Sequence, residues 1–164
     1  MRIAHLAVLV TLLTALGSAG RAQAQSVKHI QTANSGIATA VWVGDMLYVS
    51  GQLPSPATPA DQATNKPAVW GNTQAQAENV FAKIEAILKE QGLGMGNVVM
   101  MRVFMIADPA MDNKLDFAGM NAAYNKYFGT PGQPNKPARS TVQVAALVNP
   151  GPLLEVEVQA ARSK

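Results

Sequence analysis

The chain has 164 residues with 13 basic and 10 acidic side chains, a formal charge of +3, two histidines and no cysteine. The absence of cysteine excludes disulfides, thiol nucleophiles and thiolate metal sites. Histidines at positions 5 and 29 alone leave little for a zinc site or a Ser-His-Asp triad, and no Lys/Arg stripe marks a nucleic-acid surface.

The first residues have the pattern of a secretory signal peptide. Arg2 precedes an apolar run from Leu6 to Leu16, and small residues then lead to Ala22-Gln23-Ala24, which has the A-x-A form of a cleavage site. The apolar run is shorter than the about 20 residues of a transmembrane helix. A buried first helix is the alternative. We expect a signal peptide at residues 1–24 and an exported protein, either periplasmic or secreted.

The remaining residues, 25–164, have the length of a single domain with its own core. Loss of Arg2 and Arg21 lowers the basic count from 13 to 11 against 10 acids, so the formal charge becomes about +1. His5 is lost as well, and we expect the remaining histidine, His29, to be an ordinary strand residue.

The N-terminal third is predicted to form strands. Val27–Thr32 alternates weakly, and two β-rich runs, Ala38–Val43 and Met46–Ser50, flank Gly44-Asp45. Two turn-forming residues between apolar runs indicate a tight hairpin. The Pro- and Thr-rich segment 54–67 is expected to be a surface loop that either lines a site or is mobile.

An amphipathic helix follows, with Asn72-Thr73 as its N-cap and Gly92 as its C-terminal stop. Its apolar residues recur at i, i+3 and i+4 spacing and form one buried stripe. They are Ala77, Val80, Phe81, Ile84, Ile87 and Leu88.

Val98–Ala107 is nearly all apolar and is predicted to be a strand covered on both faces, by the helix and by another subunit. Alternation places Val98, Met100, Arg102 and Phe104 on one face, and Val99, Met101, Val103 and Met105 on the other. A second helix is expected over 113–128, a loop over 129–136, and strands over 139–147 and 154–160. The order β-β-β-α-β-α-β-β indicates an α+β fold with helices on one face of a sheet.

Three motifs carry side chains suited to a binding site. Ser50-Gly51 leaves a strand, where glycine lets backbone approach a ligand, although a plain strand exit is the alternative. Arg139 opens a strand after a loop and offers a planar fork for a carboxylate, although spacing alone favours a surface salt bridge. Glu155 and Glu157 share one strand face, which is either solvated or, at Glu155, able to hold a water.

Five blocks together resemble the Rid family, the reactive intermediate deaminases also known as the YjgF or L-PSP group. In order they are SGQLP, NTQAQAENVFAKIEAILKEQG, FxxMNxxYxxYF, PARSTVQVAAL and LEVEVQA, and they span about Val41 to Ala161. The resemblance implies a chorismate-mutase-like fold with a mixed sheet, a homotrimer with sites in inter-subunit clefts, and no metal or organic cofactor. The implied reaction is hydrolysis of 2-iminobutanoate or 2-iminopropanoate to a 2-oxo acid and ammonia.

The same resemblance implies roles for individual residues. Arg139 corresponds to the arginine that binds the substrate carboxylate, and Glu155 to the carboxylate that positions the attacking water. Ser50 and Gly51 correspond to a cleft wall from the neighbouring subunit. Two further positions match substrate-contacting family positions: Asn121 on the second helix, and Thr141 where many members have cysteine.

One departure from the family pattern leaves an alternative open. Active members have a tyrosine about twelve residues before the Ser-Gly pair, where this chain has Ala38. A non-catalytic module that binds a small carboxylate in the same cleft is therefore the second interpretation. The ribonuclease role of some relatives is disfavoured by the near-neutral charge and the lack of a usable histidine.

Overall fold

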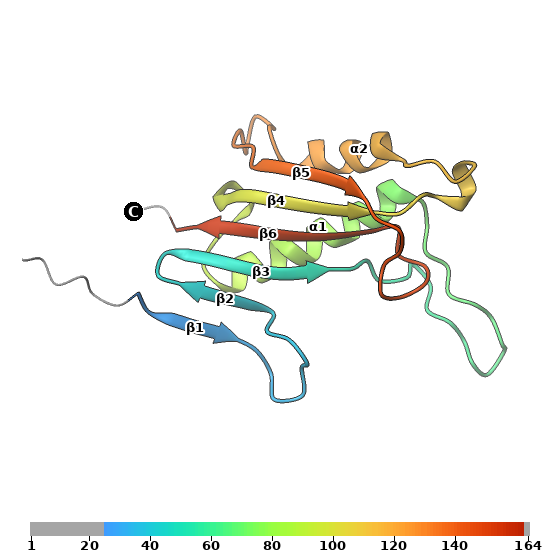
Figure 1. The fold of residues 1–164 in the computed structure, drawn as a ribbon, viewed down its shortest axis with the longest axis horizontal. Coiled ribbons are helices and arrows are strands. Elements are labelled where there is room, and N and C mark those ends of the chain that lie inside the picture. Colours follow the sequence, from blue (N-terminus) through green and yellow to red (C-terminus); the bar gives the residue numbers. More distant parts are fainter. Residues whose placement is uncertain (1–24, 163–164) are drawn as a thin grey trace, which may run out of the picture.

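A computed structural model describes residues 25–162, and the predicted signal peptide at 1–24 lies outside the described residues. Six strands form one sheet in the order β1-β2-β3-β6-β4-β5 within this part of the chain, and two α-helices lie behind it (Figure 1). No helix among residues 25–162 combines the length and apolarity needed to cross a bilayer. The elements are β1 (Val27–Ile30), β2 (Ala40–Val43), β3 (Met46–Gln52), α1 (Thr73–Glu90), β4 (Val98–Met105), α2 (Phe117–Tyr127), β5 (Ala138–Gln143) and β6 (Leu154–Ala161).

The predicted order of elements is confirmed, and so is the α+β class. The sheet is mixed because β4 and β5 run parallel while the other neighbouring strands pair antiparallel. The hairpin between β2 and β3 turns at Gly44-Asp45, where Gly44 adopts the left-handed φ of +58° that favours glycine.

Helix α1 begins and ends where its capping residues predict. The side chain of Asn72 accepts a hydrogen bond from the Ala75 amide at 3.0 Å. At the other end Gly92 is left-handed, and the amides of Gly92 and Leu93 donate to the carbonyls of Lys89 and Leu88. The apolar stripe of α1 packs against β3 and β6. The stripe residues with no exposure are Ala77, Val80, Phe81, Ile84 and Leu88.

The core lies between the helices and the sheet. Helix α2 packs beside α1 through an aromatic cluster in which Phe81 contacts Tyr127 and Phe128 with ring centroids 5.4 and 6.2 Å apart. On the sheet side, the core includes Leu47, Val49, Met101, Val103, Met105, Val156 and Val158.

The opposite face of the sheet, called here the open face, is not covered by any element among residues 25–162 (Figure 1). It carries half-buried or exposed side chains, namely Tyr48, Arg102, Phe104, Val142, Glu155 and Glu157. The prediction that another subunit covers this face stays a prediction.

The alternation predicted for β4 is wrong at its start. Val98 is buried with Met101, whereas Val99 is 44% exposed. The pairing of β4 with β6 shifts register between Val98 and Met100, and such an irregularity reverses which face each preceding side chain occupies.

Two predicted boundaries are also wrong. Helix α2 begins at Phe117 rather than at residue 113, because Asp112 and Asn113 are left-handed and Asp116 caps the helix by accepting a hydrogen bond from the Gly119 amide. Strand β5 ends at Gln143 rather than at residue 147, and the following residues leave the sheet as a loop.

Candidate functional site

Strand β5 forms one edge of the sheet and presents Arg139 toward α2. Arg139 is in register with buried Met101 of the neighbouring parallel strand, so its side chain emerges on the helix side. The guanidinium carbon lies 4.4 Å from the ring centroid of Tyr124 and 5.7 Å from that of Phe117. These contacts are cation–π interactions, and they fix the guanidinium against α2.

The charge of Arg139 is not neutralised within the described chain. Among residues 25–162, no carboxylate forms a salt bridge with it, and its one side-chain contact of hydrogen-bond type is to Met120 Sδ at 3.9 Å. A surface salt bridge therefore does not explain this arginine. A half-buried guanidinium that stacks on aromatic rings keeps its planar fork available for an external carboxylate.

Two other predicted residues lie on the same side. Thr141 follows Arg139 by two residues on β5 and points to the same face. Its hydroxyl is buried and has no hydrogen-bond partner among residues 25–162. Asn121 is half-buried on α2, one turn from both Phe117 and Tyr124. Arg139, Thr141 and Asn121 are called here the arginine group.

The remaining predicted residues gather on the open face. The Ser50 hydroxyl donates to the Ala38 carbonyl at 2.7 Å. A Cβ placed on Gly51 would overlap the Glu155 carboxylate, so the absence of a side chain at Gly51 is what lets Glu155 lie against the backbone. Ser50, Gly51 and Glu155 are called here the glutamate group.

Glu155 borders a hollow of about 280 Å³. The hollow is otherwise apolar and is lined by Phe104 of β4 and by the loop that follows β5, through Val144, Ala146, Leu147 and Val148. Glu155 and Glu157 share one face as predicted, but Glu157 pairs with Arg102 at 2.5 Å. Within the described chain Glu155 has no such partner, which leaves its carboxylate available to a ligand or a water.

Helix α1 holds the segment that follows Gly51. Lys83 donates from its ammonium to the Leu53 carbonyl at 2.7 Å, and Asn79 accepts from the Ser55 amide at 2.8 Å. Burial lowers the pKa of Lys83 from its ordinary value. Sequence reasoning missed both residues, although their i, i+4 spacing on α1 places them on one side of the helix.

The aromatic wall around Arg139 was also missed. The second helix was predicted, but no local signal shows that Phe117 and Tyr124 face the edge strand, because that contact depends on how α2 docks on the sheet. Burial raises the pKa of the Tyr124 phenol, and the positive charge of Arg139 partly opposes this rise. Among residues 25–162, no three His, Cys, Asp or Glu side chains gather as metal ligands would.

A single chain does not bring the two groups together. The arginine group lies on the helix side of the sheet at its β5 edge, whereas Glu155 is in register with Phe104 on the open face. Arg139 and Glu155 therefore lie on opposite faces of the sheet, and neither group alone contains both a carboxylate-binding cation and a water-binding carboxylate.

Known proteins are similar to this chain in sequence and in fold. The protein-family model described as Endoribonuclease L-PSP matches residues 28–162. The mitochondrial protein MMF1 of Saccharomyces cerevisiae is 40% identical over 122 residues, covering 74% of this chain and 72% of that protein. A RutC family protein of Haemophilus influenzae is 36% identical over 112 residues, covering 66% and 73% of the two chains.

Solved structures agree with these matches. The crystal structure of yeast Mmf1 has a TM-score of 0.63 and 35% identity, and the alignment covers 84% of this chain and 100% of that one. A YjgF family protein from Neisseria meningitidis has the same TM-score, 0.63, at 21% identity, with 87% and 99% covered. At that identity the second likeness concerns the fold alone.

Proposed function

Because the chain belongs to the Rid family, which includes the YjgF and L-PSP proteins, we propose that it hydrolyses reactive enamines and imines to 2-oxo acids and ammonia. Its substrates in this proposal are of the 2-iminobutanoate and 2-iminopropanoate type. The observation that carries the proposal is the half-buried Arg139 guanidinium, which has no carboxylate partner among residues 25–162.

In the proposed reaction the substrate carboxylate binds to the fork of Arg139, with the arginine group around it. A water molecule held by Glu155 adds to the imine carbon, the carbon–nitrogen bond then breaks, and nitrogen leaves as ammonia while the carbon keeps the oxygen as a 2-oxo acid. The imine carbon is already electrophilic, so orientation and one positioned water supply most of the required effect. The reaction as written needs no metal or organic cofactor.

The proposed site is a cleft between two protomers of a homotrimer. The arginine group of one chain would meet the glutamate group of its neighbour there. Two features support this arrangement: the groups lie on opposite faces of one sheet, and no helix among residues 25–162 packs on the open face. In this proposal the protein is exported, so it would act on substrates outside the cytoplasm.

A second candidate function follows from Ala38. The Ser50 hydroxyl donates to the Ala38 carbonyl, so the alanine lies beside the glutamate group, and its methyl group cannot supply the phenolic hydroxyl of active relatives. In this alternative the same cleft binds a small carboxylate without turning it over. Binding of 2-oxobutanoate in the absence of imine hydrolysis would favour this candidate.

The test compares imine hydrolysis by three forms of the purified protein. 2-Iminobutanoate is generated in situ, and its loss is followed with wild type, Arg139→Gln and Arg162→Gln. Arg162 is a matched control because its guanidinium also stacks 4.4 Å from an aromatic ring, that of Trp42 on β2, toward the opposite edge of the sheet from β5. We expect wild type and Arg162→Gln to accelerate the reaction and Arg139→Gln to match buffer. A wild-type rate equal to buffer excludes the deaminase.

A further inference from the structure

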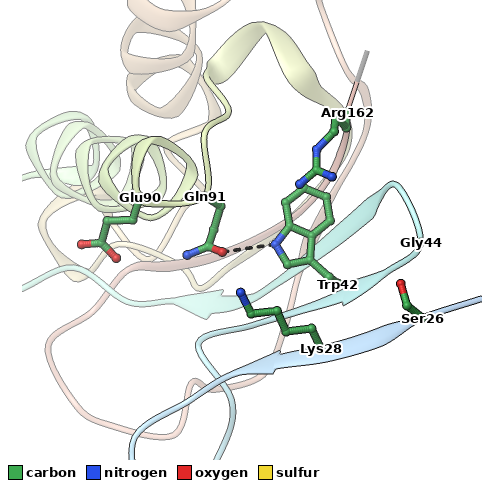
Figure 2. A pocket seen from close by; sticks show the side chains of 7 residues that line it. All are labelled: Ser26, Lys28, Trp42, Gly44, Glu90, Gln91 and Arg162. Carbon is green, nitrogen blue, oxygen red and sulfur yellow. Dashed lines mark hydrogen bonds between the residues drawn. The ribbon is translucent and has the colours of Figure 1, made fainter. Parts of the chain in front are cut away.

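A second hollow lies near the β1 edge of the sheet, and its lining includes no residue of the arginine group or the glutamate group (Figure 2). Its volume is about 340 Å³. It forms where β1, the turn between β2 and β3, the C-terminal end of α1 and the end of β6 meet. Its lining residues are Ser26, Lys28, Trp42, Gly44, Glu90, Gln91 and Arg162.

The indole of Trp42 forms one wall of this hollow and orients two of its neighbours. Trp42 is 6% exposed, and the guanidinium carbon of Arg162 lies 4.4 Å above the centre of its ring. The indole N–H donates to Gln91 Oε1 at 3.2 Å. Because an indole N–H only donates, the amide oxygen of Gln91 must face it, and the amide nitrogen is turned away from the indole (Figure 2).

Three donor groups therefore border one hollow, and none of the three has an acceptor among residues 25–162. Among residues 25–162, no carboxylate pairs with Lys28 or Arg162, and no hydrogen bond uses their side-chain nitrogens or Gln91 Nε2. Lys28 extends from β1 beneath Gln91, and Arg162 reaches the indole from the end of β6 (Figure 2). Two cations and an amide with unused donors have the chemistry of an anion site.

We propose that this hollow binds a small oxyanion, with Lys28 and Arg162 supplying the charge and Gln91 Nε2 a neutral donor. Glu90 lines the same hollow and forms no ion pair with either cation within the described chain. Its negative charge penalises a dianion more than a monoanion, since repulsion grows with the charge of the ligand. The two cations and this one carboxylate leave the hollow a net charge of +1, so the site still attracts small oxyanions.

The hollow does not depend on the proposed deaminase. Lys28 and Trp42 lie on strands β1 and β2, whereas Arg139 lies on β5 at the other edge of the sheet. The competing explanation is that the two cations only complement the negative end of the α1 dipole. That explanation predicts an effect of Lys28 and Arg162 on stability without any anion binding.

The test follows Trp42 fluorescence in the full chain with the substitution Trp70→Phe, which leaves one tryptophan. Sodium acetate and inorganic phosphate are titrated separately at fixed ionic strength, against chloride. We expect a saturable change with each of the two anions. In that background, Lys28→Gln and Arg162→Gln are each expected to weaken acetate binding about tenfold. Glu90→Gln is expected to tighten the binding of both anions, and of phosphate more than of acetate, because the repulsion it removes grows with ligand charge.

Two controls separate this site from others. Lys114→Gln removes an exposed lysine outside the hollow, and Arg139→Gln removes the proposed carboxylate ligand of the other site. Both should leave the acetate midpoint unchanged. The proposal is overturned by a change no larger than that with chloride, or by a saturable change that Lys28→Gln and Arg162→Gln do not shift.

Discussion

The three arginines of the described chain lie in two kinds of electrostatic environment. Arg102 is paired with Glu157 at 2.5 Å on the open face. Arg139 and Arg162 each stack over an aromatic ring, with no carboxylate partner among residues 25–162. An ion pair already satisfies the first guanidinium, so the other two are the ones available to external anions.

Substitutions at Gly51 and Glu155 test the proposed role of the Glu155 carboxylate. A methyl group at Gly51 would overlap the Glu155 carboxylate, which is the flexible end of a long side chain and can move away. We therefore expect Gly51→Ala to fold with little loss of stability but to displace Glu155 from its position. Its imine hydrolysis should fall about as far as that of Glu155→Gln, measured as kcat/KM.

A double variant makes this prediction sharper. If Gly51 acts only by leaving room for Glu155, then adding Gly51→Ala to Glu155→Gln causes no further loss of kcat/KM, because both changes remove the same interaction. Additive losses would contradict this account and would assign Gly51 a separate contact with the substrate.

The sequence indicated candidate side chains for a site but not their surroundings. Arg139 and Glu155 stand out because motif order and spacing are visible in one chain. The stacking of Arg162 on Trp42 was not predicted, since it joins strand β2 to the end of β6 through the sheet order. The hydrogen bond from Lys83 to the Leu53 carbonyl depends likewise on how α1 packs on the sheet.

At the scale of elements, buried Gln76 links α1 to two loops. Gln76 is 2% exposed, donates to the carbonyls of Gly71 and Gly151 at 3.1 and 3.4 Å, and accepts from the Leu153 amide at 2.8 Å. Loss of the Gln76 side chain would leave the buried backbone amide of Leu153 without its hydrogen-bond acceptor. We expect Gln76→Ala to lower the free energy of unfolding by about 2 kcal/mol or more, measured by urea denaturation.

Gln74 is the matched control because it belongs to the same turn of α1 and, among residues 25–162, its side chain hydrogen-bonds only along the helix, to Glu78 at 2.9 Å. We expect Gln74→Ala to cost less than about 0.5 kcal/mol. Equal losses from Gln74→Ala and Gln76→Ala would show that the buried links to the loops contribute nothing beyond helix propensity.

Elements with local signals were predicted closely, and those fixed by tertiary contacts were not. Helix α1 carries its own cap at Asn72 and its own stop at Gly92. Helix α2 was predicted to begin near residue 113 but begins at Phe117. The left-handed backbone of Asp112 and Asn113 and the N-cap at Asp116 set this later start. The register shift near Val98 arises from pairing with β6, which no pattern within β4 encodes.

At the scale of the whole molecule, the open face and the free edge at β5 predict self-association. Val142 lies on β5 with its side chain on the open face and is 46% exposed. We expect light scattering to give a molar mass three times that of the chain, as the proposed homotrimer requires. Val142→Lys should shift the protein toward the monomer, because it places a charge in the proposed interface.

Val69→Lys is the control for this prediction. Val69 is 56% exposed in the loop between β3 and α1, away from the sheet face, so its substitution should leave the assembly unchanged. A wild-type protein that remains monomeric at micromolar concentration would contradict the proposed trimer.

The fold class was predictable from the sequence because the order of elements restricts the possible sheets. The family resemblance implies a cleft between subunits, but periodicity alone did not show that the arginine group and the glutamate group lie on opposite faces of the sheet. Arg139 is in register with buried Met101, and Glu155 with Phe104 on the other face.

Subunit mixing tests the shared cleft most directly. Chains carrying Arg139→Gln are expected to be inactive toward 2-iminobutanoate, and chains carrying Glu155→Gln to keep only a small residual activity. In randomly mixed trimers, an intact site needs Arg139 from one protomer and Glu155 from its neighbour, so about a quarter of the wild-type activity should return. No recovery from a mixture that light scattering and mass spectrometry show to contain both chains in one trimer would contradict the account.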